Sequence, residues 1–204
     1  MKGKFITFEG SEGCGKSTQS KLLAAHLQRK GFSVVYVREP GGTRISEKIR
    51  KILLDPENRL MSEACEMLLY MAARAQIVKE IVRPALLSGK IVICDRFLDS
   101  TLAYQGYGLG VDTGLIRQIG GFATAGLKPD LTIFLDLPVK KGLVHRKFTK
   151  DRIERRPLGY HVKVRNGYLK LIRLEPRRIK LVKVEKDLKN TQEKIRGLVD
   201  KYVI

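Results

Sequence analysis

Little in the sequence would hold a disulfide-stapled or zinc-bound domain together. Cys14, Cys65 and Cys94 are widely spaced and form no CxxC pair, and the chain has three histidines. We therefore expect neither a disulfide framework nor a zinc site, which fits a reducing compartment. No stretch approaches the length of an apolar membrane span, and residues 1–9 hold no long apolar segment of the kind that signal peptides carry. These absences predict a cytoplasmic protein without membrane attachment.

The chain also lacks internal repeats and low-complexity linkers, so nothing in its 204 residues marks a boundary between independent domains. We predict a single domain over residues 1–204, long enough for a sizeable core. Acidic residues are scarce relative to basic ones: 40 Lys and Arg stand against 21 Asp and Glu, a net charge of +19. A charge of this size makes an anionic partner a hypothesis to consider.

What the sequence does contain is a regular alternation of strand-like and helical segments. Short apolar runs at 5–8, 33–37, 91–94, 131–135 and 179–184 alternate with helical spacing at 16–30, 45–54, 62–87, 113–123, 139–147, 160–173 and 191–201. This order predicts a three-layer α/β/α fold, with helices on both faces of a five-stranded, mainly parallel sheet. Ligands of such sheets bind at the carboxyl ends of the strands, so the residues that follow each strand are the candidate site residues.

The first strand end carries a phosphate-binding loop. Residues 10–18, GSEGCGKST, satisfy the pattern GxxxxGK[ST] between a strand and a helix. Glycines let successive backbone N–H groups turn inward around a phosphate, and the start of the helix adds partial positive charge. Lys16 is expected to reach the β- and γ-phosphates of a nucleoside triphosphate, and Ser17 to hold Mg²⁺. The alternative is a glycine turn that matches by chance, but strand, spacing and helix together favour the phosphate loop.

Charged residues follow the second and third strands. Arg38 opens the segment REPGGT (38–43), where it could bind an anionic substrate; the segment also fits a loop that ends in Thr43 as a helix N-cap, and spacing does not choose between them. Asp95 follows an apolar strand, as in phosphate-loop enzymes that present a carboxylate to Mg²⁺ or its waters. The adjacent Arg96 could neutralise phosphoryl oxygens, and an Asp–Arg ion pair at the strand end is the alternative.

Two further side chains lie on the helical segment 62–87. Tyr70 and Arg74 are four residues apart, so they share a helix face. If that face borders the site, an aromatic ring and a planar donor could hold a flat base. The alternative is that Arg74 is solvated or ion-paired. Residues 100–106, STLAYQG, indicate by composition only a polar helix or loop.

Together these residues closely resemble the thymidylate kinase family, whose members phosphorylate dTMP with ATP. The matching blocks occur in the family's order over nearly the whole chain: FEGSEGCGKST (8–18), REPGGT (38–43), RAQ (74–76), DRF with Ser100 and AYQG (95–106), RIE (152–154) and VRNGY (164–168). The phosphate loop alone indicates only a nucleoside triphosphate. The REPGGT and DRF…S…AYQG blocks narrow the resemblance to this family.

The resemblance implies a role for each matching residue. ATP phosphates would be held by Gly10, Ser11, Glu12, Gly13, Cys14, Gly15, Lys16, Ser17 and Thr18, and Mg²⁺ by Ser17 and Asp95. The dTMP site would comprise Glu12 at the deoxyribose hydroxyl, Arg38 and Arg96 at the acceptor phosphate, Tyr70 stacked on thymine, Arg74 at a thymine carbonyl, Ser100, Tyr104 excluding a ribose 2′-hydroxyl, and Gln105 as a second base or pocket contact. Tyr70 stands where the family usually has Phe. A homodimer is also implied, with no interface located.

The resemblance further implies a small mobile lid over approximately residues 140–158. Its catalytic candidates are Arg146 and Arg152, which join Lys16, Arg38, Asp95 and Arg96 in the predicted catalytic set. The sequence departs from the family after residue 154, where RRPLG replaces the usual acidic residues. Residues 137–189 hold 18 Lys and Arg against 5 Asp and Glu, which we interpret as a solvated basic surface. Altered lid behaviour or an anionic partner are the alternatives.

The predicted reaction is transfer of the γ-phosphoryl group of ATP-Mg to dTMP, a step in dTTP synthesis for DNA replication. Two other functions remain open at this point. One is a kinase for another nucleoside monophosphate or a deoxynucleoside. The other is a phosphate-loop protein that binds nucleic acid and uses ATP as a switch, although the sequence has no recognised nucleic-acid motif.

Overall fold

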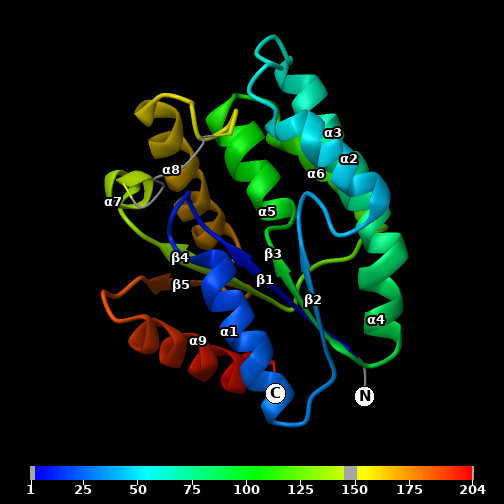
Figure 1. Cartoon of the computed structure of the whole chain (residues 1–204), viewed down its shortest axis with the longest axis vertical. Helices are drawn as coiled ribbons and strands as arrows, with labels where there is room; N and C mark the ends of the chain where they lie inside the picture. Colours follow the sequence, from blue (N-terminus) through cyan, green and yellow to red (C-terminus); the bar gives the residue numbers. More distant parts are fainter. Residues whose placement is uncertain (1–2, 145–150, 204) are drawn as a thin grey trace.

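A computed structural model describes residues 3–144 and 151–203. One five-stranded sheet organises the chain: β1 (Lys4–Glu9), β2 (Val34–Arg38), β3 (Ile91–Asp95), β4 (Leu131–Asp136) and β5 (Ile179–Lys183) lie in the order β2-β3-β1-β4-β5 (Figure 1). Every neighbouring pair is parallel. The predicted strands and fold class are confirmed, with strand ends shifted by at most one residue.

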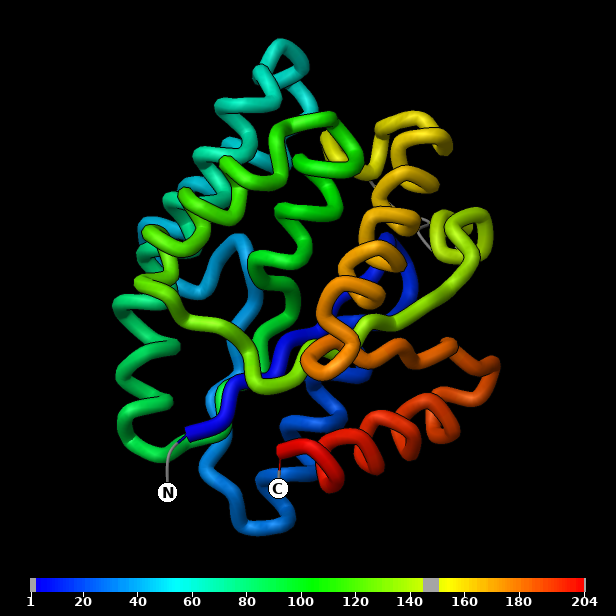
Figure 2. The backbone as a smooth tube through the Cα atoms, turned by 180° about the vertical axis from the view of Figure 1, so that it is seen from behind, coloured from blue at the N-terminus to red at the C-terminus, as the bar shows by residue number. Residues whose placement is uncertain are grey.

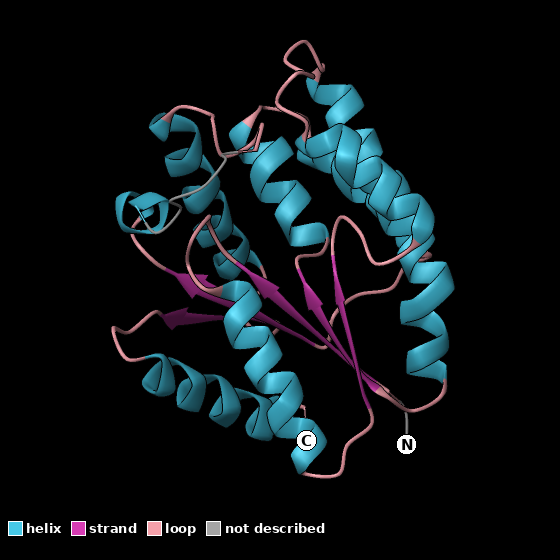
Figure 3. Cartoon of the chain, in the orientation of Figure 1, coloured by secondary structure: helices cyan, strands magenta, loops and turns pink. Residues whose placement is uncertain are grey.

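Apolar side chains on both faces of the central strands explain the continuous apolar runs. Ile6 and Phe8 of β1 join one core cluster with side chains of α1 (Lys16–Arg29) and α9 (Leu188–Tyr202). Phe5, on the alternate face, joins a second cluster with Val92 of β3. Helices therefore cover both faces of the sheet (Figure 3).

The remaining helical elements follow in chain order, and most of them pack on the face opposite α1 and α9. They are α2 (Arg44–Leu54), α3 (Glu63–Ile77), the π-helical segment η1 (Val78–Val82), α4 (Arg83–Leu87), α5 (Leu98–Thr101), the π-helical segment η2 (Leu102–Gly108), α6 (Thr113–Thr124), α7 (Val139–Val144) and α8 (Leu158–Leu174). Figure 2 shows from behind how α8 lies beside the helical segment formed by α5 and η2.

Local signals place most helix starts. Ser62 caps α3 by accepting a hydrogen bond from the N–H of Cys65 at 3.2 Å, and the predicted cap Thr43 accepts from the N–H of Ser46 at 3.1 Å. The predicted helix 62–87 is a continuous helical segment that passes through η1 into α4. Residues 100–106, for which composition indicated a helix or a loop, lie within the helical segment 98–108. For the predicted helix 139–147, α7 covers 139–144 and the last three residues lie outside the described part.

Among the helices of residues 3–144 and 151–203, none has the length and hydropathy needed to cross a membrane.

Gly167 allows α8 to pack closely against η2. A Cβ at Gly167 would lie 2.7 Å from Cβ and Cδ2 of Tyr107, so Gly167→Ala must displace the ring or shift α8. We expect this change to lower the free energy of unfolding by about 1–3 kcal/mol. Gly197→Ala in α9 is the matched control, because its Cβ meets no described atom within 4 Å beyond its own helix, and it should raise stability by about 0.5–1 kcal/mol. Urea unfolding of both variants checks this, and unchanged stability of Gly167→Ala would contradict it.

Candidate active site

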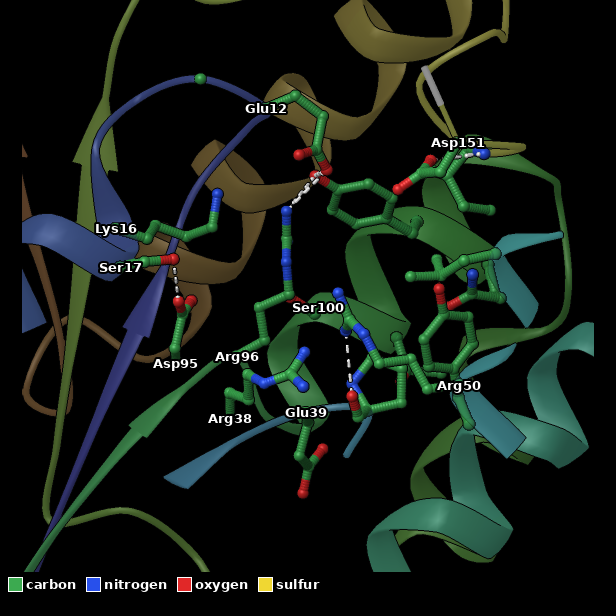
Figure 4. A pocket seen from close by; sticks show the side chains of 18 of the residues that line it. Glu12, Lys16, Ser17, Arg38, Glu39, Arg50, Asp95, Arg96, Ser100 and Asp151 are labelled. Carbon is green, nitrogen blue, oxygen red and sulfur yellow. Dashed lines mark hydrogen bonds and ion pairs between the residues drawn. The ribbon is translucent and has the colours of Figure 1, made fainter. Parts of the chain in front are cut away.

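The carboxyl ends of β1, β2 and β3 border a cavity of about 430 Å³ (Figure 4). Parallel strands bring these ends to one edge of the sheet, which is why residues far apart in the sequence meet there. The predicted site residues that line the cavity are Glu12, Gly13, Gly15, Lys16, Ser17, Thr18, Arg38, Tyr70, Asp95, Arg96, Ser100, Tyr104 and Gln105. Most of the sequence-predicted site is thus one continuous surface.

The phosphate loop has the features that a phosphate group requires. Gly15 is the N-cap of α1 at φ 88°, and no side chain caps the first turn, which leaves its backbone N–H groups to a ligand. The Lys16 ammonium donates to the Ser11 carbonyl at 2.8 Å and lies 3.7 Å from Cys14 Sγ. Within the described residues the buried Ser11 hydroxyl has no hydrogen-bond partner. This loop therefore fits the phosphates of a nucleotide.

Ser17 and Asp95 present hard oxygen atoms of the kind that Mg²⁺ prefers. The Ser17 hydroxyl donates to Oδ2 of Asp95 across the gap between α1 and the end of β3. Among residues 3–144 and 151–203, no cluster of three or more His, Cys, Asp or Glu could hold a metal. Two protein oxygens fit Mg²⁺, which keeps waters and binds substrate phosphates rather than entering an all-protein cage.

Arg96 is held rigidly beside the phosphate loop. Its φ of 74° places a non-glycine residue in the left-handed region, at a cost of about 1–3 kcal/mol. Its guanidinium donates to Glu12 Oε1 at 2.6 Å, to the Tyr104 hydroxyl at 3.0 Å and to the Ser100 hydroxyl at 3.1 Å. Among the described ion pairs Arg96 is joined to Glu12, so the alternative of an Asp95–Arg96 pair does not describe this structure.

Two further arginines face the same cavity. The Arg38 guanidinium donates to both carboxylate oxygens of Glu47 at 3.0 and 3.2 Å, and its side chain remains 44% exposed. The helix-cap interpretation of the REPGGT segment is confirmed by Thr43, and Arg38 lines the cavity, while its binding of an anionic substrate stays a prediction. Arg50 of α2 donates to the Pro40 carbonyl at 3.0 Å, and burial, together with the nearby Arg38 charge, lowers its pKa.

The far wall of the cavity carries the groups suited to a base and a sugar. Tyr70, Thr101, Tyr104 and Gln105 line it. Burial raises the pKa of Tyr70, so its ring stays neutral at physiological pH. The Tyr104 hydroxyl donates to Glu12 Oε1 at 2.8 Å, which ties this wall to the phosphate loop.

Comparisons with known proteins identify the family of the chain. A profile of the thymidylate kinase family matches residues 8–195. Proteins named thymidylate kinase from Geotalea uraniireducens and Symbiobacterium thermophilum are each 50% identical, over 97% and 98% of this chain and 96% and 94% of their own lengths. The chain belongs to the thymidylate kinase family. The crystal structure of thymidylate kinase from Ehrlichia chaffeensis aligns with a TM-score of 0.81 at 30% identity, over 98% of this chain and all of that chain.

In this thymidylate kinase family member, Arg74 lies beneath the cavity lining. Its side chain is 1% exposed, with Nε donating to Glu39 Oε2 at 2.8 Å and Nη1 donating to Thr101 Oγ1 at 3.0 Å. The ion-paired interpretation of Arg74 therefore describes the structure. Its expected contact with a thymine carbonyl stays a prediction, and Thr101 is its present link to the cavity.

Arg152, the lid arginine that the structure describes, does not line the cavity. The Arg152 guanidinium donates to the Leu53 carbonyl at 3.0 Å and to Glu66 Oε2 at 2.5 Å, and Arg152 does not belong to the cavity lining. Its neighbours Asp151 and Ile153 do line the cavity. Arg146 lies outside the described residues. The catalytic assignments of both arginines stay predictions, and the Arg152 guanidinium is paired with Glu66 in this structure.

Sequence reasoning missed several residues that line the cavity or form hydrogen bonds with its lining residues. They are Glu9, Glu39, Arg50, Glu66 and Thr101. Glu9 carried a signal, since a charged residue ends an otherwise apolar strand. Arg50 and Glu66 carried none, because helical spacing does not say which partner a charged residue meets.

Glu9 lies directly below the phosphate loop, fully buried at the end of β1. It accepts hydrogen bonds from the Phe97 N–H at 2.8 Å, the Ser100 hydroxyl at 2.5 Å and the Tyr168 hydroxyl at 2.8 Å. Burial, with a smaller contribution from the Asp99 charge, raises its pKa to about 7. Glu9 thus holds the end of the DRF segment and Ser100 by its hydrogen bonds, while its raised pKa brings its protonation near neutral pH.

The raised pKa predicts a pH-dependent stability. The unfolded carboxyl ionises near pH 4.5 and the folded one near pH 7, so the stabilisation is complete below pH 4.5 and is lost as the pH rises through 7. The unfolding free energy of wild type relative to Glu9→Gln should therefore fall by roughly 3 kcal/mol at most over this window. Urea unfolding of both proteins between pH 4.5 and 8 measures the difference. A difference that is flat over this range would contradict the shift.

Proposed function

We propose that the chain transfers the γ-phosphoryl group of ATP to dTMP with Mg²⁺, as a step in dTTP synthesis for DNA replication. The single observation that supports this reaction is the cavity itself. Its lining combines a phosphate loop, a second wall that can bind an anion, and a wall of aromatic and amide side chains, and its volume suits a nucleotide. The family membership gives the reaction its specific substrate. ATP binds at residues 10–18 and dTMP at the opposite wall.

The side chains act mainly by positioning and by neutralising charge. Both nucleotides are strongly anionic, so bringing them together requires cations at defined places and exclusion of water. Lys16 binds the donor phosphates, while Arg38 and Arg96 bind the acceptor phosphate. Ser17 and Asp95 would hold Mg²⁺, which would supply further charge neutralisation for the phosphoryl groups.

Glu12 and Tyr104 set the sugar end of the acceptor site. Their mutual hydrogen bond places a carboxylate oxygen and an aromatic ring side by side. In the proposal Glu12 meets the deoxyribose 3′-hydroxyl and Tyr104 occupies the space that a 2′-hydroxyl would need. Tyr70 stacks on thymine, and its neutral hydroxyl is compatible with the buried wall.

A reducing, cytoplasmic location is part of the proposal. The three cysteines are free, and Cys14 and Cys94 are buried. Burial raises the pKa of Cys94, which keeps it as a thiol. Such cysteines serve as small packing residues and fit a compartment that holds ATP and free nucleotides.

A nucleotide panel tests the proposed reaction. Wild-type protein with ATP-Mg should release ADP strongly with dTMP and weakly with dCMP, AMP or no acceptor. Arg96→Ala should lower turnover by about 10²–10³, since it removes a donor aimed at the developing charge. Arg83→Ala is the control with normal turnover, because Arg83 contacts carbonyls at the end of α6. Folded wild type that ignores dTMP, or an Arg96→Ala variant with normal turnover, would overturn the assignment.

We also propose a homodimer formed through α2, α3 and α6, which lie together at the right of Figure 1. α3 packs against both other helices, and the group exposes Ile45, Leu68, Leu115 and Phe122, with Phe122 at 89%. Apolar side chains gathered in this way favour a protein interface.

Leu68→Glu should shift the mass measured by light scattering from that of a dimer toward that of a monomer, whereas Leu174→Glu on α8 should not. A monomeric wild type contradicts the proposal.

A further inference from the structure

Glu66 is a buried carboxylate that the proposed reaction does not use. It lies on α3 with no exposed surface, yet it accepts three hydrogen bonds from two separate segments. Gln105 Nε2 of η2 donates to Oε1 at 2.7 Å. Arg152 and Arg156 donate from their Nη2 atoms to Oε2 at 2.5 and 2.6 Å. Burying a charged carboxylate costs free energy, and its hydrogen-bond donors offset that cost only when all of them are in place.

The carboxylate determines how the Gln105 amide is oriented. An ionised carboxylate only accepts hydrogen bonds, so the amide must turn its NH₂ toward Glu66 and its oxygen away from it. Gln105 lines the cavity, and within the described residues its Oε1 accepts no hydrogen bond. The cavity wall therefore presents a hydrogen-bond acceptor at this point.

The neighbouring hydroxyl is oriented in the opposite sense. Thr101 Oγ1 accepts from Arg74 Nη1 at 3.0 Å, and Arg74 is held in turn by Glu39 at 2.8 Å. The Thr101 hydroxyl hydrogen is then left for an acceptor in the cavity, which Thr101 also lines. The wall thus carries a donor and an acceptor side by side.

Glu66 also holds the segment 151–156, a second part of the cavity wall, through its ion pairs with Arg152 and Arg156. Arg152 is also tied to the end of α2, by its Nε to the Leu53 carbonyl at 3.0 Å and by its N–H to the Leu54 carbonyl at 3.2 Å. Asp151 and Ile153, on either side of Arg152, line the cavity. One carboxylate therefore fixes both the Gln105 amide and the 151–156 segment.

We propose that Glu66 is a positioning residue that sets base specificity, by fixing the Gln105 amide with its oxygen toward the cavity and by holding the 151–156 segment against that wall. This inference rests on the proposed function. A thymine edge offers one donor, N3–H, between two carbonyl acceptors, and it matches an acceptor beside a donor. Cytosine carries a lone pair at N3, so the fixed amide oxygen opposes it.

Glu66→Gln tests the inference because it keeps the shape and removes the charge. A glutamine at 66 can donate or accept, so Gln105 is no longer restricted to one orientation. The dissociation constants of dTMP and dCMP, measured by calorimetry, should approach each other by about tenfold, with weaker dTMP binding and ATP binding unchanged within about twofold. Glu66→Asp keeps the charge but draws the carboxylate back by one methylene group, which lengthens its contact with Gln105. It should show the same change and serves if Glu66→Gln does not fold.

Two control variants separate positioning from a merely structural role. In a Gln105→Met background, Glu66→Gln should not alter the dTMP-to-dCMP ratio further, because the amide is already absent. Glu175→Gln removes a carboxylate that pairs with Arg178 and lies outside the cavity lining, so it should leave the ratio unchanged. An unchanged ratio in both Glu66 variants, or parallel weakening of dTMP and dCMP, would overturn the inference. Wild type that binds dTMP without phosphorylating it would overturn the proposed function alone.

Discussion

The cations around the cavity are each held by an acceptor that the chain itself supplies. Lys16 is bound to a phosphate-loop carbonyl, Arg96 to Glu12 and Arg38 to Glu47. Positive side chains crowded at one edge of a sheet repel one another. Without such acceptors, these side chains would have to become ordered each time a substrate binds. Prior ordering lowers the cost of binding and of reaction, since donors that are already aimed need not reorganise. The fold supplies this by bringing three strand ends and a helix start to the same place.

Buried carboxylates form the layer below these cations. Glu9 and Glu39 both have pKa values raised to about 7 by burial, although Arg74 opposes the shift at Glu39. Their role is to accept hydrogen bonds from backbone and hydroxyl groups or from one arginine. Glu66 instead meets two guanidinium groups and an amide. If one member of such a buried cluster is removed, the remaining charged groups are left unpaired in a poorly solvated site. The cluster is therefore stable only as a complete set, even though burying its charges costs stability.

The sequence allowed the strand ends to be predicted, but not the contacts between them. The apolar runs predicted all five strands, and GSEGCGKST, REPGGT and DRF predicted which residues would meet at the cavity, because sheet geometry follows from the βα alternation. The roles of Arg74 and Arg152 could not be predicted in this way. Their partners Glu39 and Glu66 are 35 and 86 residues away, and no periodicity encodes a pairing at that distance. Arg152 shows the consequence: a motif placed it near the cavity, whereas a buried carboxylate decides where its guanidinium lies.

The basic excess after residue 137 has a physical account in the same structure. Part of it is neutralised by internal pairs, Arg165 with Asp136 and Arg178 with Asp99. Other charges lie on β5, the edge strand of the sheet, where Lys180 and Lys183 flank an exposed Leu181. Charged side chains on an edge strand oppose pairing with the edge of another molecule. The lysines of β5 therefore disfavour pairing through this edge, whereas α2, α3 and α6, which expose Ile45, Leu68 and Phe122, provide the apolar surface on which the proposed dimer rests.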